Sequence, residues 1–145
     1  MDQFQKCVPE EEEKEPQGCP NMLQITSALF LVPAAACISK GRLGGVIIYS
    51  ANAVCSVYVH RPDRTSKDNW ADVADHILVL AWVCYNAWLL ITKPSDMYQV
   101  AIACAIIVAV TKVITKFLKY RSIQRYITHA IMHTTGAAGS LLLVL

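Results

Sequence analysis

Charged residues are scarce in this chain once its first 21 positions are set aside, and that scarcity excludes an ordinary soluble domain. Charged side chains make up 17% of the 145 residues, whereas hydrophobic ones make up 54%, and the mean hydropathy is +0.37. A soluble bundle needs polar helix faces to cover its core, and the apolar runs of this sequence leave none. The composition therefore predicts one all-α domain that lies in a membrane.

Two further patterns are missing. The six cysteines show neither CxxC nor zinc-finger spacing, and four of them lie inside apolar runs, where a cysteine is usually a small buried hydrophobe. The first 21 residues are acidic and contain three prolines, which excludes a signal or transit peptide. We expect residues 1–21 to form a disordered acidic tail.

Five apolar runs predict an integral membrane bundle of about five transmembrane helices. They cover residues 22–38, 43–59, 71–92, 97–115 and 123–145. At 1.5 Å per residue the runs are about 25–35 Å long, enough to cross a hydrocarbon core of ~30 Å. Because the connections are short and polar, neighbouring helices should run antiparallel, in up-down topology. Pro33 should kink the first helix.

Lysine and arginine are distributed unevenly between the two predicted sides. The tail and the second and fourth connections hold nine of them: Lys6, Lys14, Arg61, Arg64, Lys67, Lys116, Lys119, Arg121 and Arg125. The other side holds three: Lys40, Arg42 and Lys93. The positive-inside rule then places the N-terminus in the cytoplasm and the C-terminus on the opposite side. Lys112, within the fourth run, should snorkel to the basic side. The basic cluster from Lys112 to Arg125 predicts contact with lipid headgroups and no binding of nucleic acid.

Polar side chains inside three of the predicted spans form the candidate site. Such residues are costly in a membrane unless they face a cavity or one another. The end of the second span and the starts of the third and fifth lie on the same side, so we expect their polar residues to converge in the cytoplasmic leaflet. In chain order these residues are Asn52, Ser56 and His60, then Asp72, Asp75 and His76, then His129 and His133.

The histidine spacing predicts a zinc site. His129 and His133 are four residues apart, so both imidazoles can reach one metal ion, and His60 can complete the shell from another helix. Neutral imidazole nitrogens suit Zn²⁺, and a three-histidine shell leaves a fourth position for a water whose pKa falls to ~7. The alternative is that each histidine packs as a neutral hydrogen-bonding group between helices.

Three short motifs resemble those of the CREST superfamily of membrane hydrolases, which includes the alkaline ceramidases and the progestin and adipoQ receptors. They are Ser56-Val57-Tyr58-Val59-His60, an aspartate at the start of the next helix, and His129-Ala130-Ile131-Met132-His133. Members of that family look like seven-helix bundles with zinc held by three histidines near one membrane face. This chain has five predicted spans, which preserves the direction of the last helix. A bundle shortened in this way could be completed by a second copy.

The resemblance implies a ceramidase-like, zinc-dependent hydrolase of a lipid amide or ester. In that scheme His60, His129 and His133 bind zinc, Asp75 is the general base and Ser56 donates a hydrogen bond to the developing oxyanion. Asp72 is the alternative aspartate, and His76 and Asn52 are secondary candidates.

Two other functions are compatible with the same residues. Histidines on different helices could be axial ligands of a haem, which a Soret absorption band would reveal. The polar residues could also serve only to hold the helices of a non-catalytic bundle together.

Overall fold

The computed structural model describes residues 19–61, 69–92, 97–118 and 123–145, and all its regular secondary structure within these ranges is α-helical. The helices are α1 (Cys19–Ala28), α2 (Leu31–Ser39), α3 (Leu43–Val59), α4 (Asn69–Thr92), α5 (Tyr98–Phe117) and α6 (Ile123–Val144). Four stretches are long and apolar enough to cross a membrane, namely Asn21–Ser39, Trp70–Thr92, Tyr98–Phe117 and Ile123–Val144. Helix α3 is a shorter apolar helix. The chain is an all-α integral membrane protein, which confirms the predicted fold class.

The helix boundaries differ from the predicted ones by a few residues. The predicted tail, 1–21, is wrong for its last three residues, because α1 begins at Cys19. The rest of that prediction, 1–18, lies outside the described residues. Helix α4 begins two residues before the predicted run, at Asn69, and α5 ends two residues after it, at Phe117.

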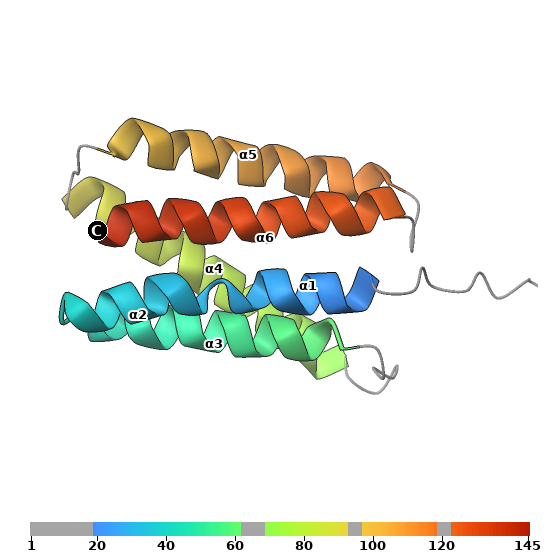
Figure 1. Cartoon of the computed structure of the whole chain (residues 1–145), viewed down its shortest axis with the longest axis horizontal. Helices are drawn as coiled ribbons and strands as arrows, with labels where there is room; N and C mark the ends of the chain where they lie inside the picture. Colours follow the sequence, from blue (N-terminus) through green and yellow to red (C-terminus); the bar gives the residue numbers. More distant parts are fainter. Residues whose placement is uncertain (1–18, 62–68, 93–96, 119–122) are drawn as a thin grey trace, which may run out of the picture.

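The first span is broken rather than simply kinked. Helix α1 ends at Ala28 and α2 begins at Leu31, and the backbone amides of Leu29 and Phe30 bond to carbonyls three residues back. Pro33 explains the place of the break, because its ring lacks an N–H and clashes with the carbonyl four residues earlier, that of Leu29. The two halves remain in line (Figure 1).

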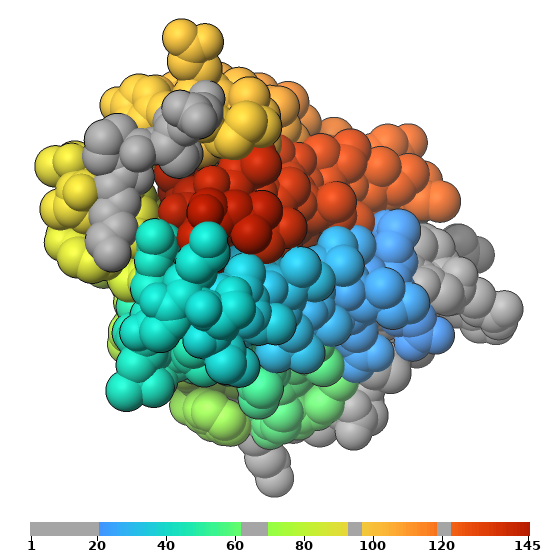
Figure 2. All heavy atoms as spheres, turned by 60° about the vertical axis from the view of Figure 1, so that its left-hand side comes forward, coloured from blue at the N-terminus to red at the C-terminus, as the bar shows by residue number. Residues whose placement is uncertain are grey.

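Helix α6 lies at the centre of the packing. It contacts α5 most extensively, and it also contacts α1, α2 and, less closely, α4. Figure 2 shows α6 in red between α2 and α5 on one face of the molecule. Helix α4 packs on α3 and makes few contacts with α5. The bundle is therefore tight around α6 and looser between α4 and α5.

Small residues allow α5 and α6 to approach closely. Gly139 of α6 is buried, and a Cβ atom built on it would lie 2.8 Å from Cβ of Cys104 on α5. This separation is shorter than van der Waals contact, so only glycine fits at this position without a shift of the helices.

We therefore expect Gly139→Ala to lower stability by about 1–3 kcal/mol, as overpacking of a close contact does. The measurement is the thermal unfolding midpoint of the purified protein in detergent. The control is Ala138→Val, which adds more volume at the neighbouring exposed position. Equal midpoints for Gly139→Ala and wild type would contradict the close contact.

Candidate functional site

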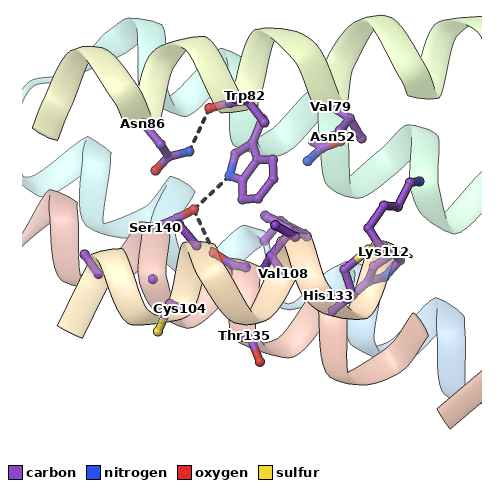
Figure 3. A pocket seen from close by; sticks show the side chains of 18 of the residues that line it. Asn52, Val79, Trp82, Asn86, Cys104, Val108, Lys112, His133, Thr135 and Ser140 are labelled. Atoms are coloured by element: carbon purple, nitrogen blue, oxygen red, sulfur yellow. Dashed lines mark hydrogen bonds between the residues drawn. The ribbon is translucent and has the colours of Figure 1, made fainter. Parts of the chain in front are cut away.

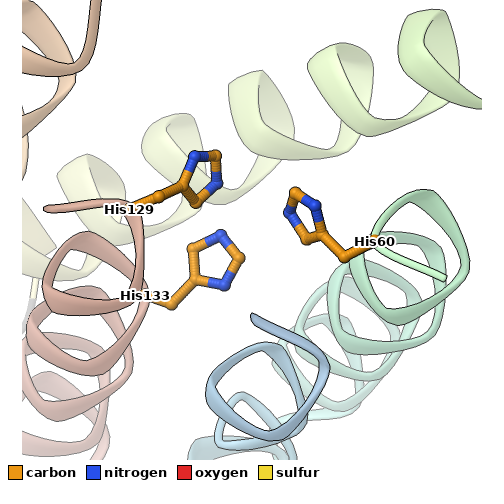
Figure 4. Close-up of side chains that lie close together, drawn as sticks. All are labelled: His60, His129 and His133. Atoms are coloured by element: carbon orange, nitrogen blue, oxygen red, sulfur yellow. The ribbon is translucent and has the colours of Figure 1, made fainter. Parts of the chain in front are cut away.

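Three histidines converge at the end of the bundle where α3 ends and α6 begins. His129 and His133 lie one turn apart on α6, and His60 is the C-cap residue of α3. The ring centroids are 4.6 Å apart for His129 and His133, 4.9 Å for His60 and His129, and 5.5 Å for His60 and His133. Figure 4 shows the three rings directed into one space between the helices.

The nitrogen atoms of these rings lie close enough to share one ligand. One nitrogen from each histidine lies within 4.8 Å of the others. In a tetrahedral zinc site with Zn–N bonds of about 2.0–2.1 Å, ligand nitrogens are separated by about 3.4 Å. Small rotations of the half-buried rings of His60 and His129 can provide that difference. Three neutral nitrogen donors from two helices are a donor set that fits Zn²⁺.

Ser27 of α1 orients His133 and was not predicted. Its Oγ lies 2.9 Å from Nδ1 of His133, 2.7 Å from the carbonyl oxygen of Leu23 and 3.1 Å from Oγ of Ser56. Ser27 has one hydroxyl hydrogen, and the shortest of these contacts is to a carbonyl, which can only accept. Ser27 therefore accepts the Nδ1–H of His133, and this assignment from the hydrogen-bond network leaves the Nε2 lone pair of His133 available to a ligand.

Ser56 belongs to the same group of side chains. It is 5% exposed, and it lies one turn before His60 on α3. Its Oγ contacts Ser27 at 3.1 Å, so the two serines join α1 and α3 behind His133. The predicted proximity of Ser56 to the histidines is present, although its contact with His133 passes through Ser27.

A cavity of about 440 Å³ adjoins the histidines. His129, His133, Ser56 and Asp75 line it, and the rest of its wall is mainly apolar side chains of α4, α5 and α6. Five lining residues on α4 and α5 are exposed, which means that the cavity opens to the outside between these two helices: Val83, Ala87, Ala105, Ala109 and Lys112. For a membrane protein this opening faces lipid acyl chains.

The structure separates the two candidate aspartates. Asp75 lines the cavity, and its Oδ1 atom is buried. Asp72 and His76 instead line a shallow apolar hollow on the outer side of α4, where Nδ1 of exposed His76 lies 2.7 Å from the backbone oxygen of Asp72. The secondary candidates Asp72 and His76 are therefore not gathered with the other site residues.

Asn52, the third secondary candidate, faces the cavity. It is 3% exposed, and its Oδ1 accepts no hydrogen bond from the described residues. A buried acceptor without a partner costs about 1–3 kcal/mol, so such an atom indicates a place where a ligand or water donates.

A second polar network lies at the far end of the cavity. Nε1 of Trp82 donates to Oγ of Ser140 at 2.8 Å, and the Tyr49 hydroxyl donates to Oδ1 of Asn86 at 3.0 Å. Figure 3 shows Asn86 and Ser140 toward one end of the cavity and His133, Asn52 and Lys112 toward the other. All the polar groups of this second network have partners on the protein, so it fixes the helices and is not a candidate ligand site.

Comparison of the chain with family models, curated proteins and solved structures found no match.

Proposed function

We propose that this protein is a membrane-embedded zinc hydrolase that cleaves a lipid amide or ester, similar to the CREST membrane hydrolases. The observation that carries the proposal is the convergence of His60, His129 and His133 beside an apolar cavity that opens between α4 and α5. A metal-binding group of this kind next to an aspartate and an acyl-sized cavity has the components that hydrolysis of a lipid requires.

His60, His129 and His133 are the residues that would hold the ion. Zinc bound there would polarise the substrate carbonyl and make a water molecule acidic enough to ionise near neutral pH. Ser27 would act as the positioning residue, because its hydrogen bond fixes which nitrogen of His133 points away from α1. Ser56 would support Ser27, with which it is in contact.

Asp75 is the proposed general base. The oxygen of water adds to the carbonyl carbon, Asp75 takes one proton of that water and passes it to the leaving nitrogen or oxygen, and the C–N or C–O bond breaks. The products are a fatty acid and an amine or alcohol. Only a carboxylate that lines the cavity can do this, which favours Asp75 over Asp72.

The position of the site suits a lipid whose scissile bond lies just below the membrane surface. His60 follows the last turn of α3, and His129 lies in the second turn of α6, so the site is near the ends of both helices. The positive-inside rule assigns that side to the cytoplasm, with the C-terminus of α6 on the opposite side. The proposed substrate therefore enters from the cytoplasmic leaflet.

The test of the proposed function is metal analysis combined with turnover. Purified full-length protein should contain about one zinc ion per chain, and it should release fatty acid from an N-acyl or O-acyl lipid in detergent micelles. Chelation should stop release and added Zn²⁺ should restore it. Protein that contains no zinc after purification and cannot be loaded with it would contradict the proposal.

A second prediction concerns Ser27. Ser27→Ala removes the hydrogen-bond partner of His133, and loss of such an outer-shell contact typically lowers metal affinity by about 10–100-fold. The matched control is Thr26→Ala on the same helix, since Thr26 bonds only to backbone oxygens of α1. Zinc affinity measured by competition with a chelator should fall for Ser27→Ala alone. Equal affinities in the two variants would mean that Ser27 does not orient His133.

A further inference from the structure

Two polar groups of the cavity have no role in the hydrolysis described above. Asn52 presents a buried Oδ1 that accepts no hydrogen bond from the described residues. Lys112 of α5 lines the same cavity and is exposed at its opening. Both lie toward the histidine end of the cavity (Figure 3).

Lys112 was expected to snorkel to the basic side of the membrane, but its position also allows contact with a molecule bound in the cavity. It lies five residues before the end of α5 and lines the cavity together with His129 and Asp75. In Figure 3 its side chain extends from α5 toward the space below α4. A lysine there can form a charge-assisted hydrogen bond with a carboxylate or phosphate oxygen of a bound molecule.

The Asn52 side chain requires a hydrogen-bond donor on the ligand, whereas Lys112 requires an acceptor. An unpaired acceptor is satisfied by an N–H donor, which an amide supplies and an ester lacks. A ligand with an N–H group near the histidines would therefore be favoured over its ester analogue, because the ester leaves Oδ1 buried and unpaired.

The remaining wall of the cavity accommodates one apolar chain. From His129 to Leu143, both of which line it, α6 rises by about 21 Å at 1.5 Å per residue. A volume of about 440 Å³ lies in the range of about 300–1,000 Å³ that holds one small-molecule ligand.

We propose that the cavity binds a single-chain lipid amide that carries an oxyanion on the amine side of its amide bond. The amide N–H donates to Asn52, the carboxylate or phosphate accepts from Lys112, and the acyl chain extends along α6 toward Ser140. N-acyl amino acids have this chemistry. Hydrolysis of such a lipid rests on the proposed function. Its binding to the cavity does not, because binding needs no metal.

The test measures binding to chelator-treated, full-length protein through quenching of Trp82, which lines the cavity. The double substitution Trp70→Phe and Trp88→Phe leaves Trp82 as the only tryptophan. The reference probe is N-(9,10-dibromostearoyl)glycine, whose bromine atoms quench nearby indole. Three matched probes carry the same acyl chain. They are the neutral N-acylethanolamine, the phosphate of that N-acylethanolamine, and the O-acyl glycolate, which is the ester analogue of the reference probe.

We expect the N-acylglycine probe to bind about tenfold more tightly than the neutral N-acylethanolamine. It should also bind about tenfold more tightly than the ester probe. Lys112→Gln should remove the first preference and Lys112→Arg should keep it, while Asn52→Leu should remove the second. Tighter binding of the phosphate probe than of the N-acylglycine probe would support the proposal and identify phosphate as the oxyanion. Equal binding of charged and neutral probes, or a preference that survives Lys112→Gln, would overturn it.

Location in the cavity has its own control. Ala105→Phe fills the cavity and should abolish quenching, whereas Ala103→Phe, at an exposed position of α5 that does not line the cavity, should not. Quenching that persists in Ala105→Phe would place the lipid elsewhere and overturn the proposal. Because the ion is removed, absence of zinc from the native protein leaves this measurement unaffected. Conversely, zinc-dependent hydrolysis without these preferences would leave the proposed function standing.

Discussion

Replacement of His133 by alanine is expected to abolish zinc binding at stoichiometric level. His133 is 6% exposed, its ring lies against both His60 and His129, and its Nδ1 contacts Ser27. Alanine leaves two donors, one of them on a different helix, so affinity should fall by more than the roughly 10–100-fold that loss of an outer-shell partner costs. Elemental analysis of purified wild type and variant, normalised to protein concentration, measures the effect.

His76→Ala is the matched control for this experiment. It makes the same substitution at an exposed histidine of α4 whose Nδ1 lies against the backbone of its own helix. It should retain the zinc content of the wild type. If His133→Ala binds as much zinc as His76→Ala, the three-histidine site is not where the ion lies.

Asp75→Asn is expected to lower kcat by about 10²–10⁴-fold, the usual contribution of a general base. The amide has nearly the same shape as the carboxylate but cannot accept a proton from water. Asp75 lines the cavity without belonging to the histidine group, so zinc content should be unchanged. Release of fatty acid under saturating substrate measures kcat.

Asp72→Asn tests whether the choice between the two aspartates is correct. Asp72 lies on the outer hollow of α4, three residues from Asp75, and its substitution should leave turnover close to wild type. A large loss in Asp72→Asn together with a small one in Asp75→Asn would exchange their roles. Loss of zinc in Asp75→Asn would make Asp75 a ligand rather than a base.

The fold was predictable because in a membrane the hydrophobic pattern alone specifies where helices lie. The apolar runs located the four stretches that are long enough to cross a membrane and the shorter helix α3, and the place of Pro33 indicated an irregularity in the first stretch. The break of that span into α1 and α2 was not predictable, because it depends on how the freed backbone groups around Leu29 find partners.

The histidine group was predictable for a different reason. His129 and His133 are four apart on one helix, and the direction of the spans alone brings the end of α3 to the start of α6. Ser27 could not be found in the same way, since its contact with His133 joins residues 106 positions apart and depends on how α1 is rotated. The one signal was that Ser27 is polar within an apolar run.

Rotation of helices about their own axes limited the other assignments. Asp72 and Asp75 are three residues apart, so they lie near one another on α4, and a modest rotation decides which of them faces the cavity. Lys112 is similar, because its sequence position fits both a lipid-facing lysine and one that lines a cavity. Spacing cannot resolve such choices, whereas packing against neighbouring helices does.

The three histidines join two helices that otherwise barely meet. Helices α3 and α6 are not among the pairs with extensive contact, yet His60 ends one and His129 and His133 begin the other. An ion bound by these histidines would link the two helix ends, and its binding free energy would oppose their separation. Metal removal should then loosen the bundle at the histidine end first, while the Tyr49–Asn86 and Trp82–Ser140 bonds keep the opposite end assembled.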